Sequence, residues 1–94
     1  MLQVTNIKYL GDYKYFVSFN NGKSGVADFR RLAFEEPNAV FARFSDESFV
    51  SQGHLEHGTL LWPGEIDVAP EFVYYTVFSN EPELHDTFVK WGYC

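Results

Sequence analysis

The stretch YKYFVSFNNGKSGVADF, residues 13–29, decides the first part of the fold. Large apolar residues occupy every second position over residues 13–19, and this period of two is typical of a strand with one buried face. Asn21-Gly22 follows, and this pair readily supplies the two positive φ angles of a type I′ hairpin turn. The sequence therefore predicts an antiparallel hairpin whose second strand runs over residues 24–29.

The segments on either side extend this hairpin. Residues 2–10 are rich in strand-favouring types and predict a first strand, joined to the second by a turn at Gly11-Asp12. Asp28 can accept a hydrogen bond from a backbone N–H and so cap a short helix over residues 29–34, which ends at Glu35-Glu36-Pro37. Two further helical turns are predicted, one over residues 38–44 with Val40, Phe41 and Phe44 on one face, and one after Ser45-Asp46-Glu47 with Phe49 and Val50 toward the core.

A second informative stretch is GTLLWPGEIDVAP, residues 58–70. Residues 59–62 predict a strand whose final tryptophan is buried in the core. A turn at His57-Gly58 would pair this strand with one near His54-Leu55-Glu56. Pro63-Gly64 stops the ladder, so the strand is predicted to lie at the end of the sheet.

The acids of this stretch have two readings. Glu65 and Asp67 could form a pair for acid/base work, because two close carboxylates can have separated pKa values. Turn chemistry explains both more simply, with Glu65 solvated and Asp67 accepting a hydrogen bond as a cap or Asx-turn before Pro70. Pro70 also suits the first position of a helix, so residues 70–78 are predicted to be helical rather than extended.

The tail has its own helical pattern. Residues 80–83, Asn-Glu-Pro-Glu, resemble a capping box at the start of a helix. Leu84, Phe88 and Trp91 follow at i, i+4 and i+7, the apolar stripe of an amphipathic helix, which should end near Gly92. The stripe can pack on the chain's own domain or on a partner, and the sequence leaves both possibilities open.

These elements define an α+β fold. Their order is predicted as β-β-β-α-β-β-α-α, with no internal repeat. We expect a small antiparallel sheet of two hairpins and about five strands, with short helices packed on one face and a C-terminal helix. Ninety-four residues are enough for a single domain with one modest core.

The charge of the chain disfavours several classes of partner. Its 13 acidic and 7 basic residues give a net charge of −6, and the longest basic run is Arg30-Arg31. Direct binding to nucleic acid or to an anionic membrane needs more cations than this, so neither is expected. Cys94 is the only cysteine, which rules out an intramolecular disulfide. No signal peptide or membrane span is recognisable, and a cytoplasmic location is expected.

Motifs for catalysis or metal binding are not recognisable. His54 and His57 are three apart, which places them on opposite faces of a strand, and no zinc-ligand spacing is present. Cys94 is terminal and poorly placed to act as a nucleophile. No phosphate-binding glycine loop or nucleophile elbow occurs. We therefore expect no metal, no cofactor and no enzymatic activity.

Two stretches, YFVSFNNGKSGVADF and GTLLWPGEIDVAPEFVYY, resemble a bacterial family known as domain of unknown function 2442. The resemblance covers about residues 2–75, and its Trp-Pro and Asp-x-Ala-Pro-Glu elements are more specific than the hairpin. It implies a small cytoplasmic α+β domain with no established activity. Some members are fused to a helix-turn-helix domain, and others are encoded beside a second small protein, which has suggested toxin–antitoxin pairing.

The resemblance also suggests how the chain is organised. We expect a single domain over residues 1–94, with a family-like core over 1–78 and a C-terminal helical extension over 79–94. Nothing after residue 78 is long or basic enough for a helix-turn-helix, so any link to DNA would pass through a partner.

Acidity, the excess of aromatic residues and the lack of catalytic spacing predict a non-enzymatic interaction module. It would self-associate or bind one small cytoplasmic protein, through sheet edges or the tail helix. The alternative is a small-ligand sensor with a pocket near Trp62, Asp67 and Tyr75, and an enzyme ranks below both. The candidate interaction or pocket residues are Trp62, Asp67, Glu71, Tyr75, Phe88 and Trp91.

Overall fold

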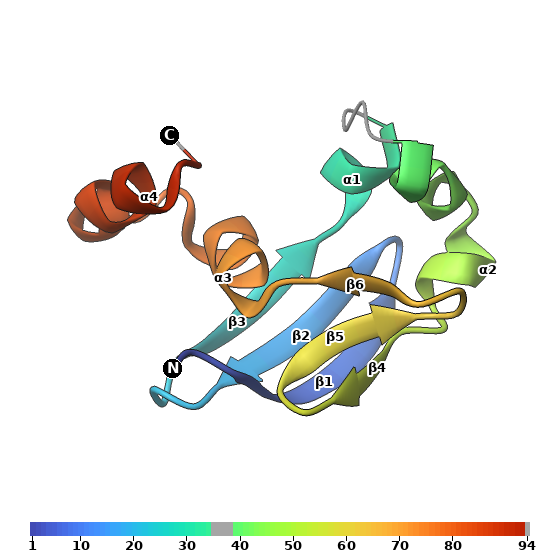
Figure 1. Ribbon diagram of the computed structural model, residues 1–94, viewed down its shortest axis with the longest axis horizontal. Helices are drawn as coiled ribbons and strands as arrows, with labels where there is room; N and C mark the ends of the chain where they lie inside the picture. The colour runs from blue at the N-terminus through green and yellow to red at the C-terminus, as the bar shows by residue number, and fades with distance from the viewer. Residues whose placement is uncertain (35–38, 94) are drawn as a thin grey trace.

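The computed structural model describes residues 1–34 and 39–93, and in these ranges the chain forms two three-stranded antiparallel sheets (Figure 1). In the first sheet β2 lies between β1 and β3, and in the second β5 lies between β4 and β6. The fold is α+β, as predicted. The strands are β1 (Val4–Gly11), β2 (Lys14–Phe19), β3 (Ser24–Asp28), β4 (His54–Glu56), β5 (Thr59–Trp62) and β6 (Ile66–Val68).

The second sheet corrects the prediction of one sheet with about five strands. β5 was expected at the end of the sheet, but it is the central strand of its own sheet. Gly64 and Glu65 adopt φ values of +87° and +61°, which turn the chain so that Ile66 pairs with Trp62. β6 has only three residues, and so short a run cannot be distinguished from a turn by its periodicity.

The hairpin between β2 and β3 forms as predicted, but its turn is of another type. Gly22 has a φ of +86°, and it is the only residue of loop 20–22 with a positive φ. Its N–H donates to the Phe19 carbonyl at 3.2 Å, while the Phe19 N–H donates to the Lys23 carbonyl at 2.9 Å. This is a three-residue loop with a glycine bulge, not a two-residue type I′ turn.

Turns with two left-handed residues occur elsewhere. His57 and Gly58 have φ values of +53° and +79°, so the turn between β4 and β5 lies where it was predicted. Asp12 and Tyr13 have φ values of +55° and +66°, which places the turn between β1 and β2 one residue later than the predicted Gly11-Asp12. Neither Asp12 nor Tyr13 is a glycine, so tertiary contacts must hold this turn.

Helical segments follow each sheet. Phe41 is half-buried and Phe44 is buried, as expected, but their segment is a 3-10 helix. The predicted stop at residues 35–37, together with Asn38, Cys94 and the Val40 side chain, lies outside the part that the structure describes. The helices are α1 (Arg30–Phe34), η1 (Ala39–Ser45), α2 (Glu47–Val50), α3 (Pro70–Phe78), η2 (Pro82–Leu84) and α4 (His85–Trp91), where η denotes a 3-10 helix.

Of the two acids predicted as caps, Asp28 is confirmed and Asp67 is not, while Asp46 caps the helical turn that was predicted to start beside it. Asp28 accepts a hydrogen bond from the Arg30 N–H at 3.0 Å, and Asp46 accepts one from the Ser48 N–H at 3.0 Å. Asp67 is neither a cap nor part of a turn, because it lies within β6 and the N-cap position of α3 is Ala69, which makes no side-chain cap hydrogen bond.

The start of the tail helix also differs from the prediction. Asn80 does not cap it, because Pro82 begins the separate 3-10 turn η2 and α4 starts only at His85. The end is as predicted, since Gly92 adopts a φ of +85° and the next residue, Tyr93, donates its N–H to the Phe88 carbonyl at 3.0 Å.

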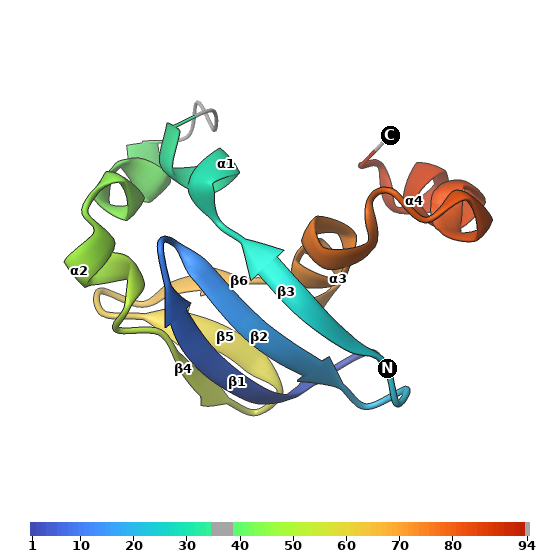
Figure 2. The same cartoon turned by 180° about the vertical axis from the view of Figure 1, so that it is seen from behind.

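The core lies where the inner faces of the two sheets meet the helices. Trp62 is buried, as predicted, and its ring lies edge-on to those of Tyr15 and Phe29, with centroid distances of 6.1 and 5.5 Å. The Phe44 ring is tilted against it at 4.7 Å. α3 packs along β3, and no helix of residues 1–34 and 39–93 covers the opposite face of the first sheet (Figure 2). The accessible features of the fold include this uncovered sheet face and a pocket beside α3.

Candidate functional site

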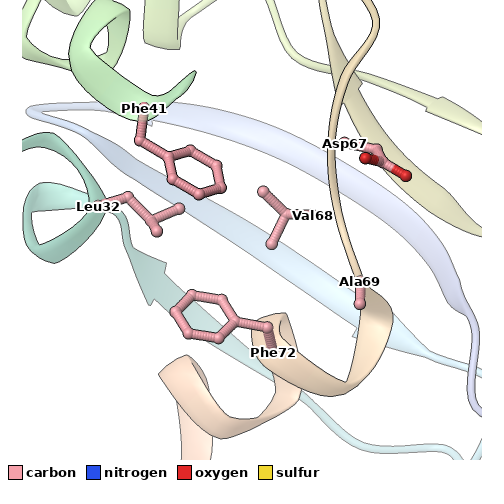
Figure 3. A pocket seen from close by; sticks show the side chains of 6 residues that line it. All are labelled: Leu32, Phe41, Asp67, Val68, Ala69 and Phe72. Carbon is pink, nitrogen blue, oxygen red and sulfur yellow. The ribbon is translucent and has the colours of Figure 1, made fainter. Parts of the chain in front are cut away.

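An apolar pocket of about 200 Å³ lies between α1, η1, β6 and α3 (Figure 3). Four apolar side chains converge on it, one from each of these elements. Leu32 and Val68 belong to the buried core, whereas Phe41 and Phe72 are half-buried and form the accessible walls. The residues that line the pocket are Leu32, Phe41, Asp67, Val68, Ala69 and Phe72.

Asp67 is the acid nearest to this pocket, but it does not make the interior polar. Its carboxylate points away from the four apolar side chains (Figure 3). The cause is the alternation of a strand, which directs the Val68 side chain to one face of β6 and the Asp67 side chain to the other. The pocket is therefore an apolar hollow with a carboxylate on the far side of its β6 wall.

Of the three residues predicted to surround a pocket, only Asp67 lines this one. Trp62 is 1% exposed and its Nε1–H donates to the Val50 carbonyl at 2.9 Å, so it holds the core together. Tyr75 does not line the pocket, because its ring packs toward the tail, against those of Phe88 and Tyr93 with centroid distances of 5.0 and 5.2 Å.

The predicted stripe of the tail packs on α3. Phe88 is 1% exposed and lies against Tyr74 and Tyr75, with the Tyr74 centroid at 6.3 Å. Trp91 remains 37% exposed, although its ring centroid lies 6.0 Å from that of Tyr74. Of the two possibilities that the sequence left open, the tail thus takes the first and docks on its own chain.

Glu71 lies apart from both of these groups. It belongs to the first turn of α3, beside a second depression of about 200 Å³ that the N-terminal residues and the turn between β4 and β5 help to form. The walls include Met1, His57 and Pro70. Glu71 and Asp67 therefore line different hollows, and the structure does not combine them into one site.

The outer face of the first sheet, the face without a helix, carries exposed apolar side chains that we did not predict as a site. Leu10, Phe16 and Val26 are 49%, 39% and 45% exposed. The sequence feature that could have predicted this surface is Phe16, a large aromatic residue that lies out of phase with the buried positions of β2. From the strand register and burial, this outer face consists of Asn6, Lys8, Leu10, Lys14, Phe16, Ser18, Ser24, Val26 and Asp28.

A network of charges surrounds the turn between β1 and β2. Hydrogen bonding to Arg30 lowers the pKa of the Asp12 carboxyl, and Lys14 lies 3.6 Å from that carboxylate. Glu47 accepts hydrogen bonds from the Tyr9 hydroxyl at 2.8 Å and from the Asp12 N–H at 3.0 Å. These contacts join the left-handed turn to α2, and they account for how a turn without glycine is held.

Neither a cluster of metal ligands nor a membrane-spanning helix occurs in the described ranges. There, no three His, Cys, Asp or Glu side chains gather closely enough to hold a metal ion. The helices of residues 1–34 and 39–93 are all too short or too polar to cross a bilayer.

The fold and its surfaces define a small α+β domain with an apolar pocket and an uncovered sheet face. Over residues 4–79 the chain matches the model of the family described as protein of unknown function (DUF2442), and it belongs to that family. The match includes α3 but ends before η2 and α4. No curated protein and no solved structure matches the chain.

Proposed function

We propose that the protein is a non-enzymatic interaction module whose outer sheet face binds another protein. The observation that carries this proposal is the row of side chains that crosses the three strands of the first sheet. Lys8 pairs with Phe16, and Phe16 pairs with Val26, so a cation and two exposed apolar residues lie side by side. Exposed apolar clusters with a polar rim are typical of protein-binding surfaces.

The charges of this face favour a particular kind of partner. The chain carries a net charge of −6, yet the outer face holds Lys8 and Lys14 and one acid, Asp28. Asp28 and Lys14 are both paired, since Arg30 lies 3.6 Å from Asp28 and Asp12 lies 3.6 Å from Lys14. Lys8 is the cation of this face for which the described ranges show no ion pair. An apolar surface rimmed by carboxylates would complement this face. A small regulatory or antitoxin-like pairing, as suggested for relatives encoded beside a second protein, is compatible with such a contact.

A site-specific crosslinker tests this proposal in the cells that naturally produce the chain. p-Benzoylphenylalanine in place of Phe16 should form an adduct with one protein, which mass spectrometry would identify. The same group in place of Val89 on α4, which is 48% exposed, serves as the matched control and should not form that adduct. The contact is then measured with both purified proteins.

Charge-reversal variants test whether binding depends on the outer face itself or only on the net charge of the chain. Lys8→Glu should weaken binding of the purified partner by about tenfold, with most of the effect in the association rate at low salt. Lys90→Glu, on α4, should leave it unchanged. Equal effects of the two variants, or adducts of the same proteins from positions 16 and 89, would overturn the proposal. An adduct with a second copy of the chain would show that the outer face mediates self-association and does not bind a separate protein.

A further inference from the structure

The free edge of β6 runs along the apolar pocket. β6 pairs with β5 on one side, and within the described ranges no strand pairs with its other side. Asp67 and Val68 of this strand, and Ala69 directly after it, also line the pocket. Unpaired strand edges can bind an extended segment of another chain through main-chain hydrogen bonds, while neighbouring pockets select its side chains.

The size of the pocket limits what can enter it. Its volume is about 200 Å³, whereas sites for metabolites and other drug-sized ligands usually measure about 300–1,000 Å³. An apolar protein cavity of about 150 Å³ is large enough to hold benzene. A single Phe or Leu side chain therefore matches this pocket better than a whole metabolite does.

The alternation along β6 determines the neighbours of that side chain. A segment added to β6 would share its two faces, so a residue in the pocket lies on the same face as Val68. The residues before and after it would lie on the face of Asp67, whose side chain is exposed. Lys or Arg at these positions would be next to a carboxylate on a chain with a net charge of −6.

We propose that the edge of β6 and the adjoining pocket bind an extended peptide segment in which one Phe or Leu is flanked by Lys or Arg. The apolar side chain fills the pocket between Phe41 and Phe72, and a flanking cation pairs with Asp67. This site is separate from the outer face of the first sheet, so the two proposals can fail independently.

The blocked pentapeptide acetyl-Ser-Lys-Phe-Lys-Ser-amide is a direct probe of this site. Titration into the full ¹⁵N,¹³C-labelled chain should shift the amide signals of residues 66–69 and the methyl signals of Leu32 and Val68. Replacing the probe's Phe with Ala should weaken binding at least about tenfold, because burial of the ring is lost. Replacing both Lys with Glu should weaken it by about three- to tenfold at low salt.

Variants of the protein test the two halves of the site. Ala69 is exposed and lines the pocket, so the larger ring of Ala69→Phe should obstruct access to it and reduce binding at least about tenfold. Asp67→Lys should reduce it about threefold or more. Glu56→Lys changes an exposed acid on β4, at the opposite edge of the same sheet, and should leave binding unchanged.

Unfolding midpoints close to that of the natural chain would verify that the variants fold. Asp67→Lys still tests the site if Ala69→Phe fails to fold. The proposal is overturned if the Phe and Ala probes bind equally or if neither binds at millimolar concentration. It is also overturned if toluene shifts the pocket signals while the peptide does not, since the pocket would then be a small-molecule site. Loss of this binding in Lys8→Glu would assign the peptide to the outer face.

Discussion

Tyr15 and Trp62 donate hydrogen bonds to the same acceptor, the carbonyl oxygen of Val50, at 2.6 and 2.9 Å. Tyr15 comes from β2 and Trp62 from β5, and their rings are perpendicular with centroids 6.1 Å apart. The Tyr15 hydroxyl also accepts the Gly53 N–H at 2.9 Å. The last residue of α2 thus joins the two sheets, and every buried polar side-chain atom in the described ranges has a partner.

Tyr15→Phe should lower the free energy of unfolding by about 1–3 kcal/mol, because it removes a buried hydrogen bond to the Val50 carbonyl and leaves the half-buried Gly53 N–H without its acceptor. Urea denaturation followed by tryptophan fluorescence measures the change. Tyr75→Phe is the matched control, since no hydrogen bond of the Tyr75 hydroxyl is found in the described ranges, and it should cost much less. Equal losses in the two variants would contradict this role for Tyr15.

The same tyrosine should make stability depend on alkaline pH. Burial raises the pKa of Tyr15 from 10.0 to about 12 in the folded chain. The folded state therefore holds this proton more tightly, so its stabilisation is complete below pH 10 and is lost as the pH rises from 10 toward 12. Denaturation between pH 8 and 11 should show stability falling above pH 10, and less steeply in Tyr15→Phe. Parallel curves for the two proteins would refute the assignment.

Two exposed acids should respond differently to substitution. Asp46→Ala removes the cap of α2 and should lower the free energy of unfolding by about 0.5–2 kcal/mol. Asp67→Ala removes no cap and should change it by less than about 0.5 kcal/mol. Chemical denaturation of both variants measures the difference. A larger loss for Asp67→Ala would restore the capping role that the sequence predicted for it.

Gly25 allows α3 to lie close to β3. A Cβ atom at position 25 would lie 2.6 Å from Cγ1 of Val77, so Gly25→Ala should destabilise the chain by about 1–3 kcal/mol through overpacking. Val77→Ala removes the clashing methyl group, and the double variant should be more stable than the sum of the single effects predicts, by about 0.5 kcal/mol or more. Strictly additive losses would show that the two sites are not coupled.

The tail should loosen without unfolding the sheets. Phe88→Ala removes the buried ring that holds α4 against Tyr74 and Tyr75. Hydrogen exchange of the α4 amides should become faster by about tenfold or more, while the β2 amides stay protected. Val89→Ala, at an exposed position of the same helix, is the control. Equal loss of protection in β2 and α4 would show that the tail and the core unfold together.

Local sequence was sufficient for much of this architecture. Alternation over residues 13–19 correctly placed the buried face of β2, and His57-Gly58, Pro70 and Gly92 correctly marked a turn, a helix start and a helix end. The reason is that these signals depend on the φ angles and hydrogen bonds of a few adjacent residues.

Features that depend on distant residues were decided only by the tertiary structure. β6 exists because Ile66 and Val68 can bury their side chains beside β5, and this makes Asp67 a strand residue instead of a cap. The left-handed Asp12-Tyr13 turn needs Glu47 and Arg30, which lie at least 17 positions away along the chain. The pocket likewise requires α1, η1, β6 and α3 to meet, and no local pattern encodes the position of four segments in space.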